Sequence, residues 1–154
     1  MTLSKKATIA AVAVLMGVTM TSVSMAGPGD IKYRQAVMKA VGGHMGSMKL
    51  ILKGQGGNKN DLAGHAHAMA ELAKVALHVF PKGSSKMEGP TGALDAIWDK
   101  PDEFKEVQAA FVAESAKLAE VAKTGDIKAA AKQLGAMGKK ACGGCHKPFR
   151  EKKK

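Results

Sequence analysis

Two cysteines and a histidine near the C-terminus are the residues of this chain best suited by type and spacing to carry chemistry. The segment A-C-G-G-C-H-K-P-F-R occupies residues 141–150, and Cys142 and Cys145 are the only cysteines in the sequence. A thiol pair followed at once by a histidine, here His146, occurs in redox dithiols, zinc sites, small disulfide loops and covalent haem attachment sites. The rest of the chain must decide among these chemistries.

Three of these chemistries fit the sequence poorly. Zinc takes four ligands, or three and a water, and the adjacent Cys145 and His146 would have to chelate one ion awkwardly. A thioredoxin-like dithiol belongs to a fold with strands, and this sequence shows no strand pattern. A disulfide closing a loop of only two residues would be strained.

The spacing C-x-x-C-H is the pattern that attaches haem c. Cys142 and Cys145 lie three residues apart on one side of a helix, where each thiol can add to a haem vinyl group as a thioether. His146 follows directly, so its imidazole can ligate the iron. We therefore expect one covalent haem c. No catalytic triad, phosphate loop or carboxylate pair predicts an enzyme, and a haem peroxidase is a weaker alternative because no distal acid/base pair is evident.

The first 26 residues have the pattern of a cleaved signal peptide. Lys5-Lys6 precedes an apolar run over residues 7–18, and Ser24-Met25-Ala26 forms a small-x-small cleavage site. The apolar run is shorter than the roughly 20 residues that span a bilayer, and an uncleaved anchor is the alternative. We therefore expect one domain over residues 27–154, no membrane span after cleavage, and an oxidising compartment such as a bacterial periplasm.

The chain is strongly basic, with a formal net charge of +11 at pH 7. Much of this charge gathers between Lys139 and the C-terminus. A basic end can bind nucleic acid, an anionic membrane or an acidic protein. Export argues against nucleic acid, so we expect an acidic redox partner protein, whereas Lys152–Lys154 taken alone form a solvated tail.

The sequence contains four amphipathic helical patterns, and the helices that they predict must position the C-terminal residues. Apolar residues recur at spacings of three and four over residues 30–53, from 60 or 61 to 80, from 101 to 123, and from 127 into the motif. A short turn around Ala96-Ile97-Trp98 interrupts the long loop before the third helix. The pattern predicts an all-α fold, an antiparallel four-helix bundle, whose alanine- and glycine-rich core leaves room for a large apolar guest.

Beyond these patterns, the sequence resembles the class II cytochromes c, which comprise cytochrome c′ and its low-spin relatives. The resemblance covers nearly all of residues 27–154. It rests on four segments: I-K-Y-R-Q-A-V-M at 31–38, L-K-G at 52–54, I-W-D at 97–99 and C-G-G-C-H-K-P-F-R at 142–150. It implies an antiparallel four-helix bundle that holds a covalent haem and often forms a homodimer.

Met38 is the candidate for the second axial iron ligand. At about 100° per residue, Arg34, Met38 and Met45 share one inward face of the first helix, and His44 points away from it. A methionine stripe is usually core filler, but the resemblance places Met38 where low-spin members carry their axial methionine. We therefore predict a periplasmic electron carrier with His146/Met38 ligation. The alternative is a five-coordinate haem that binds nitric oxide or carbon monoxide at an open distal site.

The resemblance also implies that Arg34, Gln35 and Arg150 contribute to haem binding. A buried Arg34 would be costly unless paired, and the haem propionates are its expected partners; a surface arginine is the alternative. Arg150, one turn after His146, matches the basic residue beside the proximal imidazole, or caps the helix. No spacing predicts a metal site among the histidines on or near the second helix: His65, His67 and His78.

Overall fold

The structure of the protein is a computed structural model, which describes residues 26–152. The predicted signal peptide lies outside the described residues except for Ala26, as do Lys153 and Lys154. Within the described range, no helix is both long enough and apolar enough to cross a membrane.

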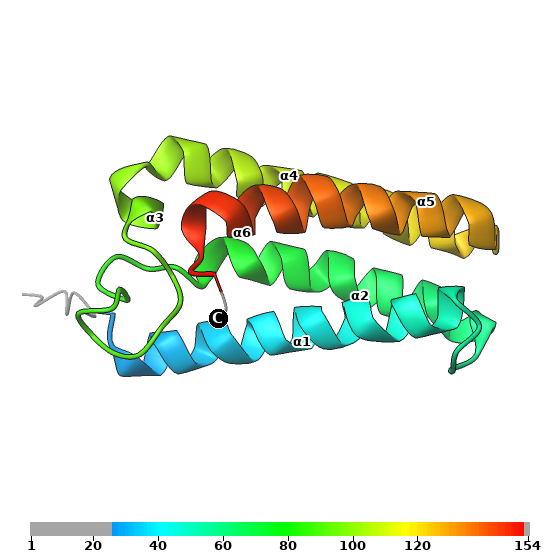
Figure 1. Ribbon diagram of the computed structural model, residues 1–154, viewed down its shortest axis with the longest axis horizontal. Helices are drawn as coiled ribbons and strands as arrows, with labels where there is room; N and C mark the ends of the chain where they lie inside the picture. Colours follow the sequence, from blue (N-terminus) through cyan, green and yellow to red (C-terminus); the bar gives the residue numbers. More distant parts are fainter. Residues whose placement is uncertain (1–25, 153–154) are drawn as a thin grey trace, which may run out of the picture.

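The described residues form an elongated helical bundle (Figure 1). Four long helices build it: α1 over Pro28–Leu52, α2 over Leu62–Val75, α4 over Pro101–Lys123 and α5 over Ile127–Met137. A π-helical segment, Gly138–Gly143, continues α5 into the short α6, Gly144–Phe149. α1 packs on α2, α2 on α4, and α4 on α5 and α6. The predicted all-α four-helix bundle is confirmed.

Local chemistry sets the helix ends. α1 begins at Pro28, slightly before the predicted start. Proline suits the first turn because it has no N–H to leave unpaired. The Asp30 carboxylate also accepts a hydrogen bond of 2.9 Å from the Gly27 N–H. α2 passes into a 3₁₀ turn over Ala76–His78 and stops short of the predicted end, because Pro81 disfavours helix in the residue before it. The single turn α3, Ala96–Asp99, lies where the sequence predicts it.

The core contains few large side chains. Its main cluster combines many alanines with a small set of larger residues: Met48, Ile51, Leu62, Met69, Leu118, Leu134 and Met137. A second cluster near α3 is aromatic, and Phe104 contacts Phe80 and Phe149 edge-to-face at centroid distances of 4.9 and 5.1 Å. Cys145 packs against this second cluster. The aromatic residues therefore hold the end of the last bundle helix in place.

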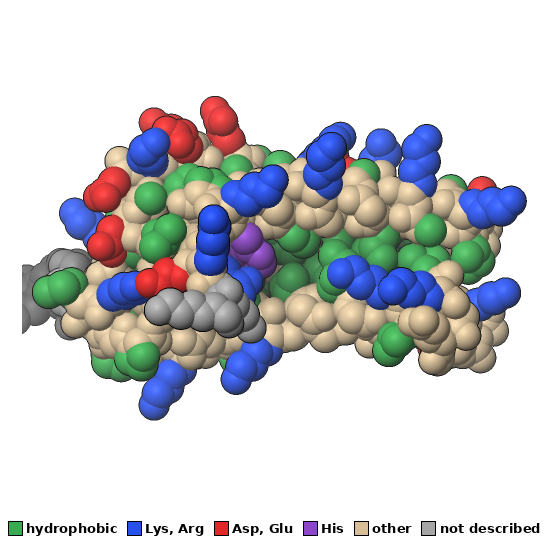
Figure 2. All heavy atoms as spheres, viewed as in Figure 1, with side chains coloured by type: hydrophobic (Ala, Val, Ile, Leu, Met, Phe, Trp, Pro, Cys, Tyr) green, Lys and Arg blue, Asp and Glu red, His purple; other side chains and the backbone are tan. Residues whose placement is uncertain are grey.

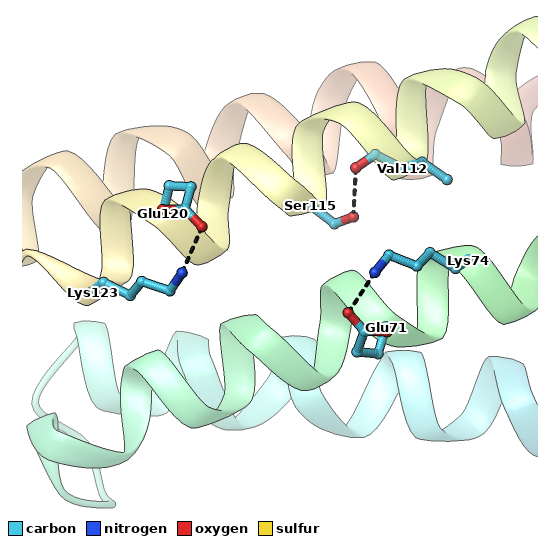
Figure 3. A network of polar contacts seen from close by, with 6 residues as sticks. All are labelled: Glu71, Lys74, Val112, Ser115, Glu120 and Lys123. Carbon is cyan, nitrogen blue, oxygen red and sulfur yellow. Dashed lines mark hydrogen bonds and ion pairs between the residues drawn. The ribbon is translucent and has the colours of Figure 1, made fainter.

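The exposed helix faces carry ion pairs. Figure 3 shows Glu71–Lys74 on α2 and Glu120–Lys123 on α4, each with an N–O distance of 2.7 Å. Such exposed pairs add little stability, because water competes for both charges. The fully buried Ser115 hydroxyl donates to the Val112 carbonyl of its own helix at 3.1 Å. The bundle is therefore stabilised mainly by packing of the apolar helix faces and not by these surface ion pairs.

Candidate functional site

A groove separates α1 from α5 and α6 on one face of the molecule. Figure 2 shows hydrophobic side chains on its floor and lysine and arginine side chains along both of its edges. α2 and α4 lie behind it, since α1 packs on α2 and α5 packs on α4. The groove is thus an apolar slot whose two walls are α1 and the last bundle helix.

The C-terminal motif lies on the helix that forms one wall of this groove. Cys142 is in the π-helical segment, whereas Cys145 and His146 are in α6. A π turn takes in more residues than an α turn, so it rotates α6 relative to the apolar stripe of α5. The buried stripe of α5 nevertheless continues through Ala141 to Phe149, and Cys145 packs against the second hydrophobic cluster. Helical periodicity predicts the stripe but not this change of turn.

Both thiols are free and half-buried. Burial raises the pKa of Cys142, and the charge of Lys49 on α1 is near enough to oppose part of that rise. Burial, with the Cys142 charge added to it, raises the pKa of Cys145 to about 11. Because burial disfavours the charged thiolate, the protonated thiol is favoured at both positions before any haem is attached.

His146 is exposed and lies beside Arg150. The Arg150 Nη1 atom is 3.3 Å from the His146 Nδ1 atom, one helical turn away. Desolvation, and then the charge of Arg150, lower the pKa of His146. The neutral imidazole is therefore favoured near pH 7, and it can offer a nitrogen lone pair to a metal. A role for Arg150 at a bound haem stays a prediction.

The backbone after α6 is tied to the loop that precedes α3. Ala93 and Arg150 form an antiparallel bridge. The Leu94 N–H donates to the Phe149 carbonyl at 3.1 Å, and the Glu151 N–H donates to the Gly92 carbonyl at 2.8 Å. These bonds fix the C-terminal end of the motif, which includes Arg150 itself.

Met38 lies on α1, the opposite wall of the groove. It is half-buried, and among the described residues it packs in neither hydrophobic cluster. Val41 and Met45 follow it at helical spacing and are also half-buried. α1 therefore offers the groove a stripe of thioether and aliphatic side chains. A bond between Met38 and iron stays a prediction.

Arg34 is buried, with 3% of its surface exposed, so the alternative of a surface arginine does not hold. Its Nη1 donates to the Ser84 hydroxyl at 2.6 Å and to the Val79 carbonyl at 3.4 Å. Its Nη2 donates to the Ser84 carbonyl at 2.7 Å and to the Thr91 hydroxyl at 3.1 Å. The guanidinium thus holds the 79–91 loop through neutral oxygens.

Aromatic rings complete the surroundings of Arg34. The guanidinium carbon lies 5.1 Å from the ring centre of Phe80 and 6.0 Å from that of Trp98. Desolvation lowers the pKa of Arg34, and Asp30 raises it in part. The expected contact with haem propionates stays a prediction, because in this structure the donors of Arg34 bind the loop.

Gln35 is exposed and also binds this loop. Its side-chain amide donates to the Pro90 carbonyl at 3.0 Å. Its predicted part in haem binding likewise stays a prediction. Arg34 and Gln35 are neighbours on α1, and both bind the 79–91 loop. Arg34 binds it from the interior and Gln35 from the surface.

Sequence reasoning missed a contact between two histidines of different helices. The Nδ1 atoms of His44 on α1 and His65 on α2 are 2.9 Å apart. The residues are far apart in the chain, and only the packing of α1 on α2 brings them together. Helical spacing shows that His44 faces away from the Met38 side of α1, but not which residue it meets.

The residues at the groove fit a haem better than a zinc ion. Among the described residues, no group of three or more histidine, cysteine or acidic side chains is placed to hold a metal. An apolar slot bordered by two free thiols and a neutral imidazole instead suits a flat apolar macrocycle, with the thiols for its vinyl groups and the imidazole for its iron. The donor set therefore supports covalent haem attachment.

Comparisons with known proteins agree with this geometry. The sequence model of the family described as cytochrome c′ matches residues 30–150. Cytochrome c′ of Pararhodospirillum photometricum is 38% identical over 122 residues, which covers 79% of this chain and 95% of that protein. Cytochrome c-556 of Agrobacterium tumefaciens (strain II Chrys) is 35% identical over 130 residues, covering 81% and 99%.

Solved structures extend the similarity to the fold. A ferrous variant of cytochrome c′ from Alcaligenes xylosoxidans with bound nitric oxide has a TM-score of 0.73 and 27% identity, covering 83% of this chain and 98% of that one. A carbon monoxide-bound variant from the same organism has a TM-score of 0.71 and 27% identity, covering 80% and 94%.

Proposed function

Because the chain belongs to the cytochrome c′ family and carries one covalent haem c, we propose that it binds a diatomic gas, nitric oxide or carbon monoxide, at an open axial position of that haem. In this proposal Cys142 and Cys145 form the thioethers, and His146 is the only protein ligand of the iron. Met38 lines the opposite face without binding the metal. The observation that carries the proposal is the match to gas-bound structures over nearly their whole length.

The comparisons favour this alternative over the predicted His146/Met38 electron carrier. Two similar structures hold nitric oxide and carbon monoxide, respectively. When bound, the haem supplies an iron atom with an axial position at which such a gas can bind. The chain supplies the attachment, the proximal imidazole and an apolar distal wall.

The distal wall contributed by α1 supports a neutral diatomic ligand. The polar groups of Arg34 and Gln35 are directed to the 79–91 loop. The stripe of Met38, Val41 and Met45 has no N–H or O–H side-chain donor. The polarity and the hydrogen-bond donors on the distal side of a haem decide whether its iron binds a ligand, activates it or only transfers electrons. A wall without donors suits nitric oxide and carbon monoxide, which need no hydrogen bond to bind.

Electron transfer is the second candidate function, and one observation favours it. Lysine and arginine side chains line both edges of the groove (Figure 2), where an acidic redox protein would dock. We propose such a partner, a periplasmic location and a role without enzymatic turnover. Homodimer formation stays a prediction from the family resemblance.

The spin state of the iron tests the proposal. We expect the purified holoprotein to be high-spin in both oxidation states, because Met38 does not bind the metal. The Met38→Ala variant should keep the same absorption and electron paramagnetic resonance spectra, as should the control Met45→Ala on the same helix face. A low-spin wild type, whose methionine-to-iron charge-transfer band disappears only in Met38→Ala, would show that the electron-carrier prediction is the right one.

A further inference from the structure

Among the described residues, the only side-chain hydrogen bond that joins α1 to α2 lies between two histidines. The Nδ1 atoms of His44 and His65 are 2.9 Å apart, and both side chains are half-buried. The ring centroids are 5.1 Å apart, which nearly equals the nitrogen distance plus the two ring radii, so the nitrogens point at each other. This is the geometry of an N–H···N hydrogen bond, in which one Nδ1 donates and the other accepts. The two nitrogens therefore share one proton.

The helix is intrinsically weak at this point of α1. Three glycines surround His44: Gly42, Gly43 and Gly46. All three are exposed, and a Cβ atom at any of them would have no contact within 4 Å outside its own helix backbone. Glycine disfavours helix because it has more backbone freedom to lose than other residues. The contacts of α1 with α2 therefore contribute much of the stability of this segment.

A second added proton is incompatible with this hydrogen bond. The neutral pair can take up one proton and keep the bond, because the accepting Nδ1 still has its lone pair. When both imidazoles are charged, both Nδ1 atoms carry hydrogen, so the bond is lost and two like charges face each other. From this geometry we propose that the His44–His65 contact is pH-sensitive: it holds the middle of α1 on α2 near neutral pH and releases it in acid.

The charged groups around the pair do not offset a second proton. On α1, the residues one turn from His44 are uncharged: Ala40, Val41, Ser47 and Met48. On α2, Asp61 lies one turn before His65 but is exposed, so water screens its charge, and the nearby His67 is also exposed. Lys53 and Lys59, in the connection between the helices, are exposed and positive. α4 contributes uncharged residues to the core shared with α2: Leu118, Ala119 and Ala122. Among the described residues, the ion pairs include neither His44 nor His65.

The direction of the pH effect follows from the protons that each state binds. In an unfolded chain, histidines take up protons as the pH falls below about 6.5. The unfolded protein therefore binds two protons at this pair in acid, whereas the hydrogen-bonded pair of the folded protein binds at most one. Because the folded state binds fewer protons, its stability falls as the pH falls. A difference of one proton raises the equilibrium constant for unfolding about tenfold for each pH unit below about 6.5.

Urea unfolding of the haem-loaded protein, from about pH 8 to about pH 5, tests this proposal. The test variants are His44→Gln and His65→Gln, because the glutamine carbonyl can accept a hydrogen bond from a protonated partner. The control is His67→Gln, a change at an exposed histidine of α2. Below about pH 6.5, the unfolding constant of wild type and of His67→Gln should rise about tenfold more per pH unit than that of either test variant. Equal pH dependence in all four proteins would overturn the proposal, as would the same reduced dependence in His67→Gln.

Nuclear magnetic resonance of the wild type supplies a second measurement, which needs no variant to fold. The isotope-labelled protein is reduced and kept under carbon monoxide, so that a low-spin ferrous iron does not broaden the histidine signals. At neutral pH we expect a scalar coupling between the Nδ1 atoms of His44 and His65 across the hydrogen bond, and in acid we expect this coupling to disappear. Two histidines that titrate independently, without this coupling at any pH, would contradict the proposal.

Discussion

The Cys142→Ala/Cys145→Ala double variant is expected to lose all covalently bound haem. These are the only cysteines in the chain, so no other thiol can form a thioether. His146 alone would hold the cofactor through a single coordinate bond, which denaturation breaks. The variant should also be much less stable, since a ligand that binds only the folded state contributes its binding free energy to folding. Haem staining after denaturing electrophoresis measures the first effect, and thermal unfolding measures the second.

The single variants are the matched controls for this experiment. Cys142→Ala and Cys145→Ala each leave one thiol, and each should retain haem through one thioether. Cys145 also packs against the aromatic cluster at Phe104 and Phe149, so its loss should cost more stability than the loss of Cys142. Covalent haem in the double variant would contradict the assignment of the motif.

The Arg34→Met variant is expected to lose about 2–4 kcal/mol of unfolding free energy, because oxygens buried with the guanidinium lose their donors. Ser84 is fully buried, and its carbonyl and hydroxyl both accept from Arg34. The loss is smaller than the sum of these bonds, because methionine removes the cost of burying the cation. Urea unfolding followed by circular dichroism measures the change.

Lys32→Met is the control for this prediction. It makes a similar change at an exposed position of the same helix, and it should leave stability nearly unaltered. If Arg34→Met were as stable as Lys32→Met, the guanidinium would not be what holds the 79–91 loop against α1. A stable variant in which only the haem absorption spectrum changed would instead favour the propionate contact expected from the family resemblance.

The parts of this molecule that were predictable from sequence are those with a local signal. Apolar spacing predicts the long helices, and the fixed C-x-x-C-H spacing predicts the chemistry of Cys142, Cys145 and His146. The π-helical segment was not predicted, because the same apolar residues form a stripe whether the turn is α or π. The segment packs on α4, and a local sequence pattern does not contain that contact. The local signals therefore identify the elements and the motif but not their fine geometry.

Contacts between distant segments could not be predicted from these local sequence patterns. The partners of Arg34 come from a loop that begins 45 residues later in the chain. Helical spacing places the arginine on an inward face without indicating what it meets there. The contact of His44 with His65 has the same origin, since the packing of α1 on α2 creates it. Each is decided by tertiary packing, which no short pattern encodes.

The rate at which the reduced protein binds carbon monoxide tests the central claim most directly. If the axial position opposite His146 is open, the observed rate should rise linearly with carbon monoxide concentration, because no protein ligand has to leave first. If Met38 occupies that position, the rate should level off at the rate of methionine dissociation, and Met38→Ala should remove the plateau. Linear dependence in the wild type is the predicted result, and a plateau abolished by Met38→Ala would contradict it.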